Sequence, residues 1–262
     1  MKEKISACIT ACNEERKISR CLESVVPFSD EIVVVDSFSV DRTVEICKRY
    51  TDRVYQHEWL GYVGQKNLIK DMAAGPWIFF IDADEEVSPT LCKEIRDLFE
   101  SGRSRSYDGF EFPRRVHFLG KWIMHGEWYP DLKLRLFRKD KGDCVGREPH
   151  DRVVVHGNTV RLKGPLYHFT YNDIMDQIQT LNRFSSIAAQ GMCEEGRRFR
   201  MHDLLFRPMV RFVKGYIFKL GFLDGVQGWI IAIASSFFVF LKYAKLWERR
   251  HASGSGDIET RE

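Results

Sequence analysis

The chain has 262 residues, of which 44% are hydrophobic and 29% charged, and this balance excludes an intrinsically disordered protein. A chain of this length can bury a sizeable core, as one large domain or as a domain with an appendage. The net charge of only +3 gives no reason to expect nucleic-acid binding, and seven cysteines without a CxxC spacing indicate neither a zinc site nor a disulfide framework.

The first part of the chain alternates between predicted strands and predicted helices. We expect strands at 5–12, 31–36, 54–57 and 77–81, and helices at 16–26, 42–50 and 62–74. The second strand, EIVVVD, is a continuous β-branched run, which is typical of a parallel strand buried on both faces. This rhythm predicts an α/β fold with a mainly parallel, Rossmann-like sheet flanked by helices, in which ligands bind beyond the carboxyl ends of the strands.

The strongest chemical signal is a buried strand that ends in two aspartates, in the stretch IFFIDADEE at 78–86. If the extended conformation continues, Asp82 and Asp84 point to the same side. Two converging carboxylates are costly to bury unless a positive charge lies between them. A divalent metal that holds a phosphate is the obvious candidate, with Asp84 as its ligand and Asp82 on the metal or on a ribose hydroxyl.

The next elements change the pattern from helix and parallel strand to antiparallel strand. Ser88 and Pro89 predict an N-cap and a first helical residue, for a helix that runs to about Ser101. Short alternating runs between 107 and 169 predict antiparallel strands, and 173–191 predicts a helix.

Residues 226–241 form the most apolar stretch of the chain, with basic residues before and after it. The stretch is shorter than the ~20 residues of a usual membrane span, so we favour a helix that lies in the bilayer interface. A buried core helix and a true span remain alternatives. The basic flanks are either solvated helix faces or contacts to anionic lipid headgroups.

Several polar residues at the predicted strand ends could bind a nucleotide-sugar. Asn13 and Glu14 follow the first strand and would contact the base or ribose, and Asp36 could accept a hydrogen bond from a base N–H. Lys66, on a helix that enters the same region, could offset phosphate charge. Taken alone, Asp36 is more simply an N-cap or turn residue. The shared placement at the sheet ends favours function.

Four successive motifs in the first hundred residues resemble those of the family 2 inverting glycosyltransferases with the GT-A fold. They are TACNEE at 10–15, VDSFSVDRT at 35–43, QKN at 65–67 and DADE at 82–85. The likeness continues through RLFR and EPHD, near 135–151, and through LYHFTY at 166–171 and GFLDG at 221–225. These later motifs resemble the branch that includes lipopolysaccharide core glucosyltransferases. A linked series in the right order is far more specific than a lone DxD motif.

The resemblance implies roles for individual residues. The nucleotide would lie against Thr10, Ala11, Asn13, Glu14, Asp36, Lys66, Asp82 and Ala83. Asp84 would bind Mg²⁺ or Mn²⁺, and His150 would complete the metal shell or steer the leaving phosphate; a hydrogen-bonded structural role is the alternative for His150. Asp151 is our candidate for the catalytic base, which takes the proton of the attacking hydroxyl. The branch usually has Glu at this position, and Asp is one methylene shorter.

Three aromatic residues of the second half, Trp122, Trp128 and Tyr129, could stack on acceptor sugar rings, although core packing explains any one of them equally well. We expect a nucleotide-sugar-binding half at 1–106 and an acceptor-binding, catalytic half at 107–200. A helical, membrane-associated segment would follow at 201–250, and a disordered tail at 251–262.

The sequence thus predicts an inverting, metal-dependent glycosyltransferase. Its donor would be a nucleotide-sugar, with UDP as the expected nucleotide, and its acceptor a lipid-linked saccharide such as a lipopolysaccharide core. The N-terminus lacks the apolar core of a signal peptide, so we expect a cytoplasmic protein, peripheral on the inner face of the cytoplasmic membrane. The alternatives are a nucleotidyltransferase, which would usually have a Gly-rich phosphate loop after its first strand, and a non-catalytic nucleotide-sugar-binding protein.

Overall fold

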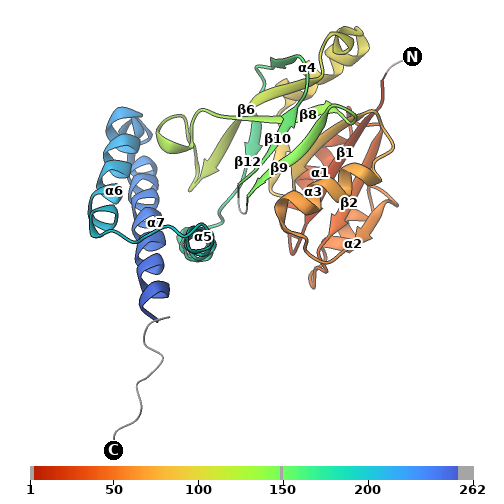
Figure 1. Cartoon of the computed structure of the whole chain (residues 1–262). Helices are drawn as coiled ribbons and strands as arrows, with labels where there is room; N and C mark the ends of the chain where they lie inside the picture. Colours follow the sequence, from red (N-terminus) through yellow and green to blue (C-terminus); the bar gives the residue numbers. More distant parts are fainter. Residues whose placement is uncertain (1–2, 148–149, 253–262) are drawn as a thin grey trace, which may run out of the picture. The chain divides into compact units, whose positions relative to one another are not determined.

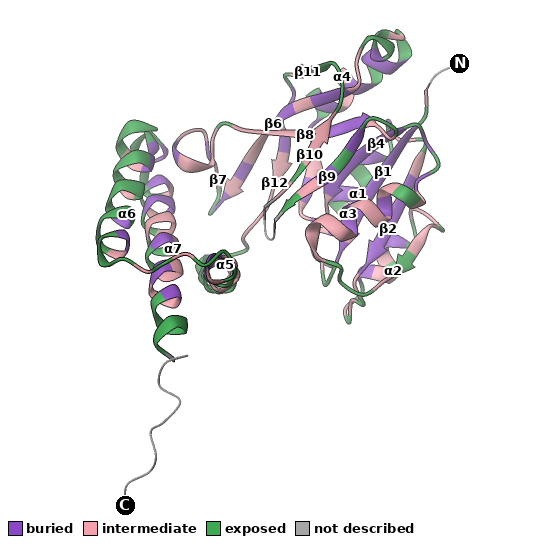
Figure 2. Ribbon diagram, in the orientation of Figure 1, coloured by how far each residue is buried: buried purple, intermediate pink, exposed green. Residues whose placement is uncertain are grey.

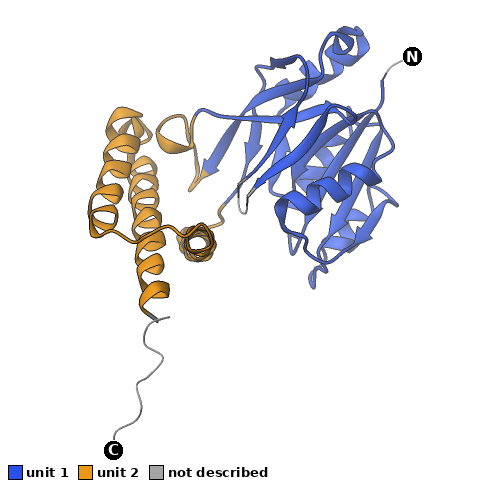
Figure 3. Ribbon diagram, viewed as in Figure 1, with its two compact units in different colours: residues 1–117, 130–170 blue, residues 118–129, 171–262 orange. Residues whose placement is uncertain are grey.

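The computed structural model describes residues 3–147 and 150–252 (Figure 1). The chain divides into two compact units, of which the first comprises residues 1–117 and 130–170 and the second residues 118–129 and 171–262 (Figure 3). The finer boundaries expected at 106 and 200 remain predictions. The tail expected at 251–262 lies, from residue 253 on, outside the described residues.

The first unit is built on a mixed sheet in which the strands follow the order β3-β2-β1-β4-β8-β6-β12-β5. The strands are β1 (Ile5–Ala11), β2 (Glu31–Asp36), β3 (Val54–Gln56), β4 (Trp77–Asp82), β5 (Glu85–Val87), β6 (Gly109–Phe118), β8 (Asp131–Arg138), β11 (Thr159–Arg161) and β12 (Leu166–His168). The predicted parallel core is confirmed, because β1 pairs in parallel with both β2 and β4, and β2 with β3. The antiparallel part is confirmed in the pairs β4–β8 and β6–β8.

Two further strands, β9 (Gly142–Arg147) and β10 (His150–Val155), form a small antiparallel sheet. The helices of this unit are α1 (Ile18–Val25), α2 (Thr43–Cys47), α3 (Gly61–Met72), α4 (Pro89–Glu100) and the 3₁₀ turn η1 (Arg103–Ser106). The predicted cap of α4 is confirmed, since Ser88 accepts a hydrogen bond from the Leu91 N–H at 3.1 Å and Pro89 opens the helix.

Side chains that alternate along the strands fill separate hydrophobic clusters on the two faces of the sheet. Figure 2 colours the central strands of the sheet largely as buried. On β1, Ala7 and Ile9 join the cluster of α1 and α4, whereas Cys8 joins the cluster that includes Ile69 of α3. Because both faces are covered, the polar chemistry is confined to the strand ends.

The expectation that Asp82 and Asp84 share one extended run is wrong. β4 ends at Asp82, Ala83 and Asp84 form a turn, and β5 begins at Glu85. The reversal of the chain sends the two carboxylates to different partners, described below.

The second unit is helical, with short elements from residues 118–129. Its elements are β7 (Lys121–Trp122), η2 (Gly126–Trp128), α5 (Ile174–Glu194), α6 (Met201–Val213), the short π-helix η3 (Lys214–Phe218), η4 (Gly221–Asp224) and α7 (Gly225–Ala252). Both α5 and α6 pack along α7, where Tyr243 and Leu246 are buried. The predicted apolar helix is confirmed and is longer than 226–241 at both ends.

Candidate active site

The register of the sheet brings the predicted residues to one edge. Ala11 pairs with Asp36, and Thr10 pairs with Asp82, so the carboxyl ends of β2, β1 and β4 lie side by side. Asn13 follows β1 in the left-handed region, with φ of 56°, a conformation that Asn tolerates better than most residues. The predicted edge of polar residues is therefore assembled by the parallel strands themselves.

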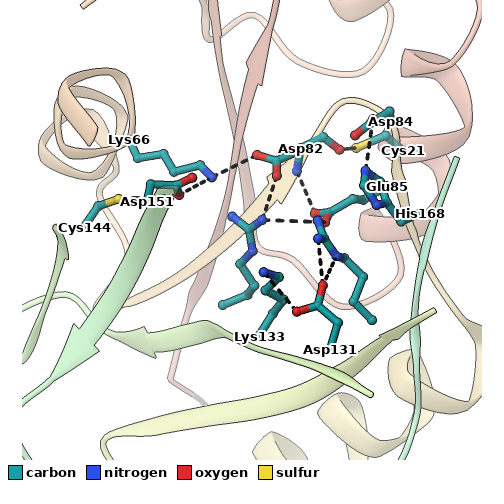
Figure 4. A network of polar contacts seen from close by, with 12 residues as sticks. Cys21, Lys66, Asp82, Asp84, Glu85, Asp131, Lys133, Cys144, Asp151 and His168 are labelled. Atoms are coloured by element: carbon teal, nitrogen blue, oxygen red, sulfur yellow. Dashed lines mark hydrogen bonds and ion pairs between the residues drawn. The ribbon is translucent and has the colours of Figure 1, made fainter. Parts of the chain in front are cut away.

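Lys66 of α3 lies between two carboxylates that are far apart in the sequence. Its Nζ is 3.1 Å from Oδ1 of Asp82 and 2.8 Å from Oδ2 of Asp151 (Figure 4). The lysine side chain is only 4% exposed, so its charge needs such partners. The positive charge expected between two acids is thus present, but it joins Asp82 to Asp151 rather than to Asp84.

Arg135 of β8 supplies a second cation at the same carboxylate. One guanidinium nitrogen, Nη2, is 2.7 Å from Oδ2 of Asp82 and 3.6 Å from Oε1 of Glu85. Arg114 then bridges Glu85, at 3.1 Å, and Asp131, at 2.7 Å. Figure 4 shows how cations and anions alternate along this network. Alternation keeps each buried charge compensated.

The network holds its acids in the charged form. Burial by itself would raise the pKa of Asp82, but Arg135 and then Lys66 hold that pKa well below its usual range. Burial also acts to raise the pKa of Asp151, and Lys66 followed by Arg135 outweighs it, so this pKa is lowered as well. The neighbouring Cys144 thiol has its pKa raised to about 11, by burial and then by the Asp151 charge. Both aspartates are thus carboxylates at neutral pH.

Asp84 lies apart from this network and faces a histidine. His168 Nε2 is 3.2 Å from Asp84 Oδ2, because the antiparallel pairing of β12 with β5 sets His168 opposite Glu85. Burial would raise the pKa of Asp84, but His168 lowers it below its usual value. The Nδ1 atom of His168 is buried without a hydrogen-bond partner in the described parts of the chain.

The pair formed by Asp84 and His168 fits a divalent cation in its donor chemistry. A carboxylate oxygen and an imidazole nitrogen suit Mn²⁺, and Mg²⁺ in nucleotide sites commonly takes only one or two protein carboxylates together with substrate phosphates. Within residues 3–147 and 150–252, no group of three or more His, Cys, Asp or Glu side chains could hold a metal. A metal here would therefore depend on the substrate for much of its coordination shell.

Asp36 and Asn13 organise a turn beside this edge. Oδ2 of Asp36 accepts hydrogen bonds from the Ser39 N–H at 2.9 Å and from Gln56 Nε2 at 3.2 Å, and Oδ1 accepts from the Ser39 hydroxyl. Asn13 Oδ1 accepts from the Val40 N–H at 2.9 Å. With its side chain fully buried, Asp36 shapes the 37–41 turn, and its predicted contact to a base remains a prediction.

The other predicted nucleotide residues lie along the same edge. Ala11 and Ala83 are buried, Thr10 is half-buried, and the Glu14 N–H donates to Thr43 Oγ1 at 2.8 Å. For His150 the structure places the backbone in β10, whereas its side chain is outside the described part, so its predicted roles remain predictions.

The acceptor-side aromatics belong to the second unit. The Trp128 ring packs against Phe118, with centroids 5.3 Å apart, and against Tyr171 at 5.8 Å. These contacts agree with the packing alternative for Trp128. The stacking role of Trp122 and Tyr129 remains a prediction.

The sequence motifs alone indicated no role for His168 or Arg135, although both residues lie inside motifs typical of the family. His168 belongs to LYHFTY and Arg135 to RLFR. A signal was available, because an arginine and a histidine inside apolar strands need buried partners. The partner of each residue, however, depends on strand pairing.

A mixed α/β sheet with acidic strand ends, a cationic network and a neighbouring small antiparallel sheet defines the class of GT-A-like, nucleotide-dependent transferases. Residues 6–156 match the family described as Glycosyl transferase family 2, and the chain belongs to this family. It is a glycosyltransferase, and the nucleotidyltransferase alternative is set aside.

The similar proteins include two of nearly the same length as this chain. An uncharacterized glycosyltransferase of Rickettsia typhi is 32% identical over 94% of this chain and 87% of its own length. The lipopolysaccharide core biosynthesis glycosyltransferase LpsC of Rhizobium meliloti is 31% identical over 97% of this chain and 96% of its own length. Among solved structures, residues 1–349 of TarS from S. aureus, in complex with UDP, superpose with a TM-score of 0.47 at 13% identity, covering 99% of this chain and 94% of that one.

Proposed function

We propose that this glycosyltransferase transfers a sugar from a UDP-sugar to a lipid-linked saccharide, with inversion at the anomeric carbon and with a divalent metal. The acceptor class is supported by the 31% identity to LpsC, a lipopolysaccharide core biosynthesis glycosyltransferase, over nearly the full length of both chains. A cytoplasmic protein that is peripheral on the inner face of the cytoplasmic membrane would meet both substrates.

Asp151 is the base of the proposed reaction. The acceptor hydroxyl attacks the anomeric carbon, its proton passes to the Asp151 carboxylate, and the bond from the sugar to the diphosphate oxygen breaks. Oδ2 of Asp151 accepts from Lys66, while Oδ1 has no hydrogen-bond donor in the described part of the chain. One oxygen therefore orients the carboxylate and the other is available for the proton.

Lys66 and Arg135 keep negative charge from accumulating at this edge. Asp82 is compensated by both cations, so it can orient a ribose hydroxyl without repelling the donor. Asp84 and His168 would hold the metal, which supplies charge neutralisation for the leaving diphosphate.

The observation that carries the proposal is the placement of Asp82, Asp84 and Asp151 near one strand edge with different partners. Asp82 and Asp151 share Lys66, whereas Asp84 faces His168. Paired acids alone would indicate only a metal. Their separate environments support the three roles that we propose: a compensated carboxylate for Asp82, a metal ligand for Asp84 and a base for Asp151.

The test is turnover of a panel of nucleotide-sugars, with and without Mn²⁺, by wild type, Asp84→Ala and Asp151→Asn. We expect Asp151→Asn to bind the donor but to lose at least about 100-fold in kcat, since general bases contribute about 10²–10⁴. Asp84→Ala should remove the metal dependence together with turnover. Asp143→Asn is the matched control, because Asp143 lies on the neighbouring strand β9 and is exposed.

Two outcomes would contradict this proposal. Unchanged kcat in Asp151→Asn would move the base to another residue. Donor binding without turnover on every acceptor would instead favour the non-catalytic nucleotide-sugar-binding alternative.

A further inference from the structure

The turn between α6 and α7 exposes apolar side chains where a soluble surface would be polar. We propose that this hairpin tip, residues 213–229, is a docking surface that inserts among the headgroups of an anionic lipid bilayer. The inference rests on the proposed function, because the bilayer would carry the lipid-linked acceptor.

Large apolar residues are concentrated in the hairpin tip. Those exposed by 45% or more include Ile217, Phe218, Leu220, Phe222, Leu223 and Val226. Phe218 is 77% exposed and Val226 71% exposed. Single exposed apolar residues are normal on soluble proteins, but a contiguous set marks an interaction surface.

The apolar surface continues along α6. A groove of about 500 Å³ is lined by Phe206, Met209, Val210, Val213, Lys214 and Phe218. Five of these six side chains are apolar. Four of the five, Phe206, Met209, Val210 and Val213, recur at helical spacing on α6, which Figure 2 draws largely in the exposed colour, and Phe218 follows in η3. An apolar surface of this kind can be buried at the boundary between the headgroups and the acyl chains of a bilayer.

The two stripes of α7 argue against a core helix, and by length and composition the helix is apolar enough to enter a membrane. Val239, Tyr243 and Leu246 are buried in the second unit, and Trp229, Ile233 and Phe237 are 44–48% exposed. Only 28% of the most apolar window of this helix is buried, whereas a core helix is mostly buried. Since α7 uses one stripe to pack on α5 and α6, the other stripe is free to face lipid.

Charge identifies the lipid as anionic. Residues 197–250 contain eleven Lys and Arg but only three Asp and Glu, although the whole chain is nearly balanced at +3. Lys214 and Lys219 are exposed within the tip, and neither forms an ion pair with any described residue. Basic residues beside exposed apolar ones attract the negative surface of a membrane.

A bilayer also fits better than a second copy of this chain. An isologous dimer through the tip would bring the lysines of one copy toward those of the other, and like charges repel. Aromatic residues at the tip also favour a bilayer. The ring centroid of Trp229 lies 5.2 Å from that of Phe212 and 5.0 Å from that of Tyr216, and Trp and Tyr prefer the bilayer interface.

The experiment measures binding of the full chain to sedimenting vesicles of phosphatidylglycerol and phosphatidylethanolamine, or of phosphatidylcholine alone. Wild type should bind the anionic vesicles and bind phosphatidylcholine more weakly. Phe218→Ser with Val226→Ser should reduce binding to both kinds at least about tenfold. Lys214→Gln with Lys219→Gln should weaken anionic binding by about twenty-fivefold, since each lysine contributes about fivefold, and should leave phosphatidylcholine binding unchanged.

Matched controls are Val26→Ser, an exposed apolar position in the first unit, and Lys48→Gln with Lys163→Gln. The inference would be overturned if the variants at the tip bound vesicles as wild type does, or if wild type did not bind anionic vesicles. It would also be overturned if wild type formed a dimer that these variants dissociate. Donor turnover on a water-soluble acceptor is measured in parallel. Turnover without vesicle binding refutes only the docking surface, and vesicle binding without turnover refutes only the proposed function.

Discussion

The two units place their charged and apolar residues in opposite ways. In the first unit, charged side chains such as Lys66 and Arg135 are buried and compensated at a strand edge, while the apolar residues fill the sheet. In the second unit, apolar side chains such as Phe218 face outward, and lysines beside them have no acidic partner among the described residues. This difference indicates that the two units bind different partners. We propose a charged substrate for the first unit and a lipid surface for the second.

The largest expected effect contrasts the buried stripe of α7 with the exposed hairpin tip. Leu246→Ala should lower the free energy of unfolding by about 4 kcal/mol, because it empties a fully buried position. Phe218→Ala, at an exposed position, should change it by no more than about 0.5 kcal/mol. Urea unfolding of both variants measures the contrast. Equal losses would mean that Phe218 of the hairpin tip is in fact part of the folded core.

The buried network can be broken at its central cation. Lys66→Met should cost about 3 kcal/mol, since it removes the lysine that Asp82 and Asp151 share and leaves their charges less compensated. Lys70→Met is the control on the same helix: its partner Asp143 is 59% exposed, so the loss should stay below about 1 kcal/mol. Denaturant titration of both variants gives the comparison. If Lys70→Met lowered the free energy of unfolding as much as Lys66→Met, the buried network would contribute no more to stability than an exposed ion pair.

At about pH 4, where these acids have only begun to lose their contribution, acid should weaken the first unit through the same network by less than the removal of Lys66. The pKa values of Asp82, Asp131 and Asp151 are lowered in the folded chain, so their contribution is complete above the unfolded pKa of about 3.9 and is lost as pH falls through the folded values. The unfolding free energy should therefore decline below about pH 4.5. Asp82→Asn, with one titrating group fewer, should show a shallower decline; an identical pH profile would contradict the assignment.

The smallest effect tests a local contact. Ser88→Ala should cost about 1 kcal/mol, because the Leu91 N–H loses its hydrogen-bond acceptor at the start of α4. Ser88→Asp should retain most of the stability, since Asp also caps helices. Thermal unfolding followed by circular dichroism measures both, and a destabilised Ser88→Asp would show that packing around Ser88, rather than capping, is what matters.

Local sequence determined much of the fold. The run EIVVVD specified β2 to the residue, and Ser88 with Pro89 specified the start of α4, because propensity and capping act over a few neighbouring residues. The parallel order of the strands also followed, since it needs only the alternation of strand and helix. The polar edge at Asn13, Asp36 and Asp82 was predictable for the same reason.

Tertiary structure alone decided which charges meet. The sequence placed Asp82 and Asp84 together, but the turn at residues 83–84 separated them, and only the pairing of β12 with β5 brought His168 to Asp84. Lys66 reaches Asp151 across 85 positions of the chain. Such partners depend on strand register and on the burial that makes an uncompensated charge costly, and neither is encoded in the spacing of one motif. The sequence determined that acids and cations stand at the strand ends, and the fold decided which of them form ion pairs with one another.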